Sequence, residues 1–159
     1  AFIRLNTTAA QSSSASAFTA VGSTTFTVGS GVLSNNAHVA YCFAPIAGYS
    51  AFGSYTGNGS SDGVFVYTGF RPRFLMIKKT SAAENWYMLD TARAPYNVAG
   101  NDLMANLSNA EATSGGAYST LFDILSNGFK ARDGGTGSNS GDFIYAAFAE
   151  FPLKFSLAR

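Results

Sequence analysis

The chain has 159 residues, of which 47% are hydrophobic and 12% charged, with a formal net charge of +1. This length is that of one domain, and the hydrophobic share argues against a disordered chain. The basic residues do not cluster, and no apolar run approaches the roughly 18–20 residues of a membrane span. We therefore expect no nucleic acid partner and no membrane insertion.

The first part of the chain predicts short strands. Residues 2–6 alternate in polarity and enter a Thr/Ala/Ser-rich stretch over 7–16 that is typical of a loop. Residues 18–21 and 25–28 flank Gly22-Ser23, which indicates a hairpin with glycine in the turn.

Residues 39–44 form a continuous apolar run that ends at Pro45. Such a run is typical of a strand buried on both faces, so we expect Cys42 to be a buried, inert thiol. One cysteine and one histidine cannot form a zinc site, and the start of the chain lacks the pattern of a signal peptide.

The rest of the chain continues as strands. Pro72 predicts a bend between two of them, Gly57–Gly63 reads as an exposed loop, and Asn127-Gly128 is a strong hairpin signal. We expect these strands at residues 49–56, 64–69, 74–79, 86–89, 122–125, 129–132 and 142–151. Residues 103–107 are compatible with a strand or a helix, and their match to Leu5 favours a strand. The sequence therefore predicts an all-β antiparallel β-sandwich, concanavalin-like or jelly-roll-like, in a single domain 1–159.

The chain also contains an internal repeat. Residues 38–44 resemble residues 143–149, and each segment follows a Gly/Ser/Asn-rich loop, at 29–36 and 134–141 respectively. A duplicated β unit explains this pattern. We expect two related units at approximately 1–48, which is incomplete, and 69–159, joined by 49–68.

The first unit lacks a counterpart of residues 69–101, although Leu5–Ala10 aligns loosely with Ala105–Ala110. We therefore expect a stretch of roughly thirty residues, resembling Phe70–Gly100, ahead of Ala1.

Nothing in the sequence marks a catalytic centre. The nine carboxylates fall mostly in expected loops, and the sequence singles out no pair of the kind that a glycosidase needs. His38 stands without a recognisable serine and acid partner. We expect no catalytic residues, no metal and no cofactor.

Asp90 and Arg93 form the most informative charged pair. They follow an expected buried strand at a spacing that suits a turn. One interpretation is a bidentate ion pair that pins the loop, and the other is a polar anchor for a sugar or a protein partner.

Aromatic residues next to expected loops are further candidates for ligand binding. An aromatic ring can stack on a sugar, although tyrosine also commonly lies at the rim of a sandwich. The candidate residues are Tyr49, Tyr55, Trp86, Asp90, Arg93 and Tyr96.

Linked motifs extend over nearly the whole chain, at residues 41–44, 48–50, 52–59, 67–72, 76–79, 90–97, 125–130 and 147–150. Together they resemble a domain of unknown function in structural proteins of marine tailed bacteriophages. Members usually carry a Pro-aliphatic-Lys front end on the earlier repeat, which this chain lacks.

The resemblance implies a non-enzymatic virion structural protein, most often a tail-fibre or similar appendage domain. It implies a homo-oligomer, commonly a trimer, in contact with other virion proteins. Adhesion to a host-surface glycan is the expected role. The alternatives are a capsid decoration or assembly protein without a ligand and a glycan-degrading spike.

Overall fold

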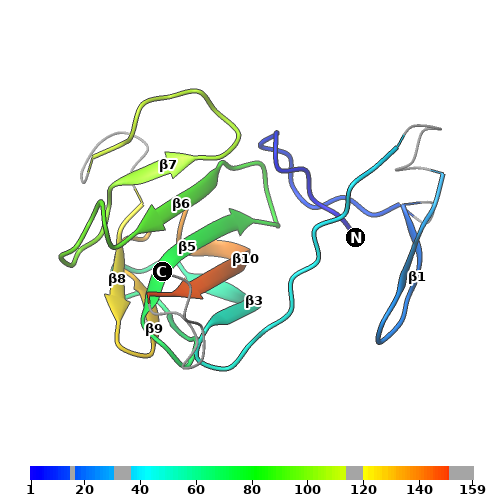
Figure 1. Cartoon of the computed structure of the whole chain (residues 1–159). Helices are drawn as coiled ribbons and strands as arrows, with labels where there is room; N and C mark the ends of the chain where they lie inside the picture. The colour runs from blue at the N-terminus through cyan, green and yellow to red at the C-terminus, as the bar shows by residue number, and fades with distance from the viewer. Residues whose placement is uncertain (15–16, 31–36, 114–119, 151–159) are drawn as a thin grey trace.

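The computed structural model describes residues 1–14, 17–30, 37–113 and 120–150, and within these ranges the fold is all-β. Figure 1 shows a body of packed strands from which part of the N-terminal region projects to one side. No helix long and apolar enough to cross a membrane occurs in these ranges. The strands are β1 (Phe18–Val21), β2 (Phe26–Val28), β3 (Ser50–Asn58), β4 (Phe65–Tyr67), β5 (Pro72–Lys79), β6 (Trp86–Asp90), β7 (Asp102–Met104), β8 (Phe122–Leu125), β9 (Gly128–Ala131) and β10 (Ser140–Ala149).

Two antiparallel sheets form the body. The larger has the strand order β3-β10-β5-β6-β7, and the smaller has the order β4-β9-β8. The hairpin predicted at Asn127-Gly128 joins β8 to β9. The predicted fold class, an antiparallel all-β sandwich, is confirmed.

The hydrophobic core lies between these sheets. Alternate residues of the larger sheet, such as Ile77 and Phe143, are fully buried and belong to one cluster with Phe122 and Phe129 of the smaller sheet. Burial of each such side chain contributes about 1.5–3 kcal/mol to stability.

Pro72 does not bend the chain between two strands, as the sequence predicted. It is the first residue of β5 and is fully buried. It pairs with Ala149 of β10, and the register between the two strands shifts between Phe148 and Ala149. Proline is tolerated at the start of a strand beside a bulge. Regular pairing is interrupted there, so the missing N–H group does not cost a ladder hydrogen bond.

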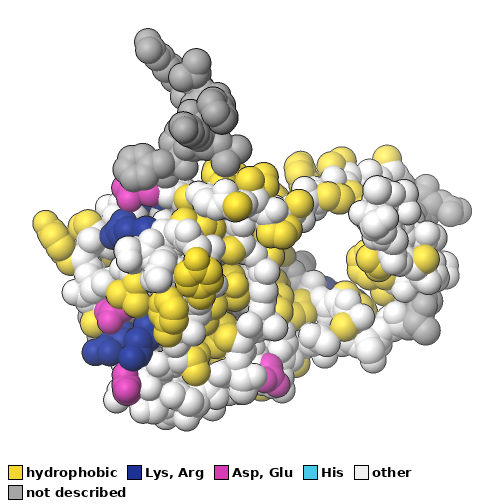
Figure 2. All heavy atoms as spheres, turned by 90° about the horizontal axis from the view of Figure 1, so that it is seen from below, with side chains coloured by type: hydrophobic (Ala, Val, Ile, Leu, Met, Phe, Trp, Pro, Cys, Tyr) yellow, Lys and Arg dark blue, Asp and Glu magenta, His cyan; other side chains and the backbone are white. Residues whose placement is uncertain are grey.

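The predicted buried strand at 39–44 is wrong. Residues 37–45 form no strand, Val39 and Tyr41 are 79% and 83% exposed, and the Cys42 thiol is exposed rather than buried. The predicted hairpin of β1 and β2 is present, but it stands away from the body as a separate two-stranded sheet (Figures 1 and 2). No described strand therefore lies beside 39–44 to pair with it. We call the described residues 17–30 and 37–44 the arm.

Two further predictions need correction. Residues 2–6 form no strand, because Phe2 makes only an isolated bridge with Ser12. The strand expected at 103–107 is shorter and starts earlier, at Asp102. The last residue of the strand expected at 142–151 and most of the loop at 29–36 lie outside the described residues.

Gly57 allows a close approach between β3 and the turn before β10. A Cβ atom at this position would lie 2.2 Å from the backbone oxygen of Asn139. That distance is far inside van der Waals contact, and the obstacle is backbone rather than a flexible side chain.

We expect Gly57→Ala to lower the free energy of unfolding by about 1–3 kcal/mol, because Cβ forces the two segments apart. Chemical denaturation measures this loss. Ser54→Ala, at an exposed position of the same strand, is the matched control and is expected to change stability by less than about 0.5 kcal/mol. Equal effects of the two substitutions would contradict the steric explanation.

Candidate functional site

The face of the larger sheet that points away from the core carries apolar side chains from neighbouring strands. The strand register places Phe52 of β3 opposite Ala146 of β10, and Ala146 opposite Met76 of β5. Ile144 and Trp86 stand in the neighbouring row of the same face. Residues two apart on a strand share a face, so this surface is continuous across the strands.

The small side chain of Ala146 leaves a hollow between larger neighbours. The hollow has a volume of about 320 Å³ and is lined by Phe52, Gly53, Met76, Trp86, Ile144, Tyr145 and Ala146. Its lining is almost entirely apolar, so it suits the face of a ring or an aliphatic group.

A second, more polar hollow shares Ile144 with the first. Its volume is about 580 Å³, and its lining residues are Gln11, Ser54, Tyr55, Thr56, Thr80, Asp142, Phe143 and Ile144. The Thr56 hydroxyl donates to Asp142 Oδ1 at 2.8 Å, and the backbone of Gln11 is held by the carbonyl of Thr80 at 3.0 Å. We call the two hollows together the outer groove.

Trp86 is held in a fixed orientation in this groove. Its indole Nε1–H donates to the Arg4 carbonyl at 2.9 Å, and its backbone N–H donates to Asn106 Oδ1 at 2.9 Å. The edge of the indole is therefore bonded to residues 1–14, which we call the N-terminal segment, while the ring lines the apolar hollow.

Lys78 lies on the same face, directly opposite Trp86, and is fully buried. Its ammonium donates to the carbonyl oxygens of Lys79 at 2.7 Å and Thr8 at 3.3 Å. Burial lowers the pKa of this lysine, and the charge of Glu84 acts in the opposite direction. The N-terminal segment thus covers a buried cation beside the groove.

Tyr55 belongs largely to the core. Its ring stacks on Phe143 with centroids 4.9 Å apart, and its hydroxyl donates to the Ser138 carbonyl at 2.6 Å. Burial, with a smaller contribution from the charge of Asp133, raises the pKa of this hydroxyl far above its usual value. Although Tyr55 contributes to the polar hollow, its hydroxyl is bonded within the protein.

Tyr49 and Tyr96 occupy different surroundings. Tyr49 packs edge-on against Phe148, with ring centroids 6.2 Å apart. Tyr96 lies in the loop after β6 and is 84% exposed. Neither residue lines the outer groove, so the structure does not gather the predicted aromatic residues into one site.

Asp90 and Arg93 organise the loop after β6. Asp90 Oδ1 accepts the backbone N–H groups of Ala92 and Arg93, both at 2.9 Å, and Arg93 Nε donates to Asp90 Oδ2 at 2.5 Å. The other guanidinium nitrogens donate to Glu111 at 2.8 Å and to the Met88 carbonyl at 3.2 Å. The predicted pinning of the loop is confirmed, but the pair is not bidentate because Arg93 divides its donors among three acceptors.

The electrostatics of this pair follow the same geometry. Burial disfavours both charges, but the mutual hydrogen bonds and attraction outweigh it, so the pKa of Asp90 is lowered and that of Arg93 is raised. Each guanidinium nitrogen of Arg93 donates to an acceptor within the protein, which favours the pinning interpretation over a ligand anchor.

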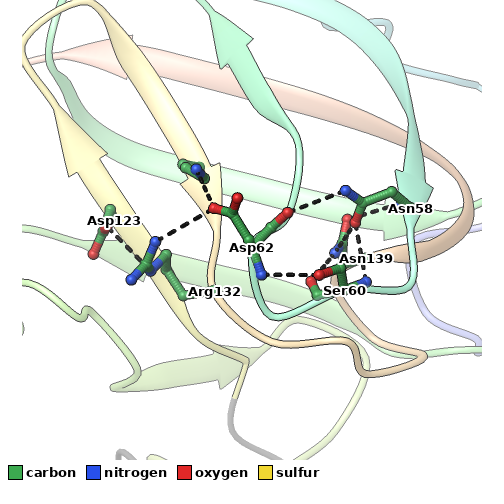
Figure 3. A network of polar contacts seen from close by, with 7 residues as sticks. Asn58, Ser60, Asp62, Asp123, Arg132 and Asn139 are labelled. Atoms are coloured by element: carbon green, nitrogen blue, oxygen red, sulfur yellow. Dashed lines mark hydrogen bonds and ion pairs between the residues drawn. The ribbon is translucent and has the colours of Figure 1, made fainter.

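A separate polar network closes the loop between β3 and β4 (Figure 3). Asn139 is fully buried and donates to Asn58 Oδ1 at 2.7 Å and to the Ser60 carbonyl at 2.6 Å. Asp62 accepts from Lys130 at 2.6 Å, and this hydrogen bond is the main cause that lowers the pKa of Asp62. The predicted exposed loop at Gly57–Gly63 is therefore bonded to β9 and to the turn before β10. Gly63, at the end of this loop, is buried.

The described residues contain no group of three or more histidine, cysteine, aspartate or glutamate side chains placed to hold a metal ion. In the network of Figure 3, Asp62 faces Lys130 and Arg132, while Asp123 faces Arg132 at 3.4 Å. Lys130 and Arg132 therefore neutralise these two carboxylates.

Sequence reasoning found Trp86 and Tyr55 but missed the other residues that line the groove. Phe52, Met76 and Ile144 belong to three strands and read individually as core residues, and Gln11 lies in a segment read as a loop. The available signal was the absence of polar alternation in β5 and β10, which indicates apolar side chains on both faces.

Asp102 is a fully buried carboxyl group. Its Oδ2 is 3.4 Å from the Thr120 hydroxyl, and its Oδ1 has no hydrogen-bond partner among the described residues. Burial raises the pKa of Asp102 to about 6, against weaker opposing effects of hydrogen bonds from Thr120 and the backbone.

We expect Arg93→Met to lower the free energy of unfolding by about 1–2 kcal/mol, because it leaves Asp90 and Glu111 without their charged donor. Chemical denaturation at low and high salt measures the loss. Arg71→Met removes a more exposed pair with Glu150 and is expected to cost less than about 1 kcal/mol. Loss of ligand binding with unchanged stability would instead support the anchor interpretation.

Asp102 predicts a pH dependence of stability. Since the pKa is higher in the folded state than in the unfolded state, the folded protein binds more protons between about pH 4 and 6. The free energy of unfolding therefore falls as pH rises through this window, by about 1–3 kcal/mol.

Asp102→Asn is expected to abolish that fall, as measured by denaturation at several pH values. Asp62→Asn is the control, because the lowered pKa of Asp62 contributes with the opposite sign. If the wild-type protein and Asp102→Asn show the same pH profile, the carboxyl group is not protonated as proposed.

Comparison with known proteins identifies the family. The chain matches no curated protein and no solved structure. A family model matches residues 1–152, which is nearly the whole chain and includes both the arm and the body. The chain therefore belongs to the family described as "Domain of unknown function (DUF7483)".

Proposed function

We propose that this protein is a non-enzymatic structural protein of a bacteriophage virion, a tail-fibre or similar appendage domain that binds a host-surface glycan in the outer groove. The observation that carries the proposal is the groove itself, in which an apolar hollow with a tryptophan adjoins a polar hollow.

The chemistry of the groove matches that of a sugar. One face of a pyranose ring presents C–H groups that pack on an aromatic surface, and the indole of Trp86 lies where such a ring would stack. The hydroxyl groups of the sugar need donors and acceptors at the ring edge, which Thr56, Asp142 and Gln11 supply in the adjoining hollow.

The groove also supports a binding role rather than hydrolysis. Asp142 is the one carboxylate among the residues named as its lining. Hydrolysis of a glycosidic bond by the usual routes takes two carboxyl groups about 5–10 Å apart.

The virion assignment rests on the resemblance of the linked motifs to phage structural proteins. The low share of charged residues supports it, because ion pairs at the surface would be screened in seawater-like salt. We further propose a homo-oligomer, commonly a trimer in such appendages, so that several weak sites act together on one cell surface.

A glycan array followed by calorimetry tests this proposal. We expect the wild-type protein to bind, and Trp86→Ala to weaken binding by about tenfold, which corresponds to the loss of one aromatic contact of about 1–1.5 kcal/mol. Tyr96→Ala removes an exposed tyrosine outside the groove and is the matched control with unchanged affinity. Circular dichroism verifies that each variant is folded.

Thr56→Val provides a second variant that keeps the size of the side chain and removes its hydroxyl group. It is expected to weaken glycan binding without altering the apolar hollow. Absence of any glycan ligand, or equal affinity of the wild-type protein and Trp86→Ala, would overturn the adhesion proposal.

A capsid decoration or assembly protein without a ligand is the second candidate. It is favoured by the large apolar side chains that the arm exposes, including Val21, Val39 and Tyr41. Figure 2 shows hydrophobic groups both on the body and on the projecting part. Binding to capsids that lack tails, with no glycan bound on the array, would favour this candidate.

A further inference from the structure

The hairpin of the arm has the same construction as the hairpin of the smaller sheet. In the arm, the rings of Phe18 and Phe26 meet edge to face, with centroids 6.2 Å apart and planes inclined by 60°. In the body, Phe122 and Phe129 meet in the same way, at 5.8 Å and 72°. In both hairpins the first of these phenylalanines starts its strand, opposite the apolar last residue of the second strand. The hairpin of the arm differs in having a register shift between Phe18 and Ala20.

The resemblance continues beyond the hairpin. In the body, β10 follows β9, and the ring of Tyr145 packs against Phe129 at 5.3 Å across the core. In the arm, residues 38–42 follow β2 and face Phe18, Phe26 and Val28 across a hollow of about 370 Å³. The arm therefore resembles β8, β9 and β10 in sequence order and in having an apolar segment that faces the hairpin, although residues 38–42 form no strand.

The arm lacks the further strands that would complete a β-sandwich. In the body, β10 is paired with β3 on one side and with β5 on the other. Residues 38–44 pair with no strand among the described residues, and their large apolar side chains are exposed. A two-stranded hairpin is marginally stable alone and needs further strands or a packed face.

A second copy of this chain does not readily supply those strands. In each copy the place between β3 and β5 is already filled by its own β10, and β4 is already paired with its own β9. Binding the arm of another copy in that place would require the body to release its own strands.

We propose that the arm is the β8–β10 half of another sandwich of the same kind, and that it docks on a β3–β7 half-unit from a further repeat of the same polypeptide. In that arrangement residues 38–44 form the central strand of a sheet, as β10 does in the body. Cys42 then takes the place of Ala147, whose side chain is fully buried. This inference does not depend on what the outer groove binds.

Cys42 gives a direct measurement, because it is the only cysteine in the chain and its thiol is exposed. The test protein carries an added copy of residues 49–104, which include β3–β7, joined directly ahead of Ala1. The added segment contains no cysteine. The readout is the rate at which Cys42 reacts with an aromatic disulfide reagent.

We expect the added half-unit to slow the reaction of Cys42 by about tenfold or more, because the thiol becomes buried and reacts only after local opening. Hydrogen exchange in residues 18–28 and 38–44 is expected to slow in parallel. The matched control carries Leu75→Asp and Ile77→Asp in the added copy alone, which places charges at two core positions. In this control Cys42 is expected to react as fast as in the original chain.

Three results would overturn the proposal. The first is an unchanged rate in the extended protein while its original sandwich remains folded. The second is equal protection by the control, which would indicate shielding without a formed core. The third is protection of Cys42 in the original chain that grows with protein concentration, together with a dimer mass, because it would assign the arm to a second copy.

Discussion

The pairing of β10 with β3 and β5 is the constraint on which the rest of the structure depends. It runs along β3 from Asn58 opposite Ser140 to Ser50 opposite Phe148, and it joins two parts of the chain that are 82 to 98 residues apart in sequence. The same strand supplies Phe143 and Ala147 to the core, and Ile144 and Ala146 to the opposite face. A disturbance of this register would therefore affect both stability and the outer groove, since a shift by one residue exchanges the two faces.

This double role explains which features the sequence could predict. β3, β5, β6, β8, β9 and β10 were predicted within a few residues, because local apolar runs and turn signals such as Asn127-Gly128 specify them. The groove was not predicted, since it depends on which residues of β3, β5, β6 and β10 stand in neighbouring rows. Tyr55 and Trp86 looked equivalent in sequence, yet Tyr55 points to the core face and Trp86 to the opposite face.

The arm shows the limit of local patterns most clearly. Residues 38–44 and 143–149 have similar sequences, but β10 is buried between two strands whereas Val39 and Tyr41 are exposed. An apolar sequence with β-forming residues indicates that a segment can pair as a strand. Whether its side chains are buried depends on whether other strands lie on either side of it. The same reasoning explains Asp102, whose burial follows from the packing around β7 and not from any feature of its neighbours in sequence.

The N-terminal segment precedes the arm in sequence and is bonded to the body. Arg4 accepts from the Trp86 indole, Thr8 accepts from Lys78 and from the backbone of Glu84, and Gln11 donates to Thr80. These contacts place the segment along one end of the sheet face that carries the groove, and the arm begins a few residues later. Because Gln11 lines the polar hollow and Arg4 orients Trp86, the shape of the groove depends on how the segment is anchored. Release of the segment would also expose Lys78 to water, where its ammonium would no longer need backbone carbonyl partners. The groove is therefore a property of the sheet together with the N-terminal segment, and not of the sheet alone.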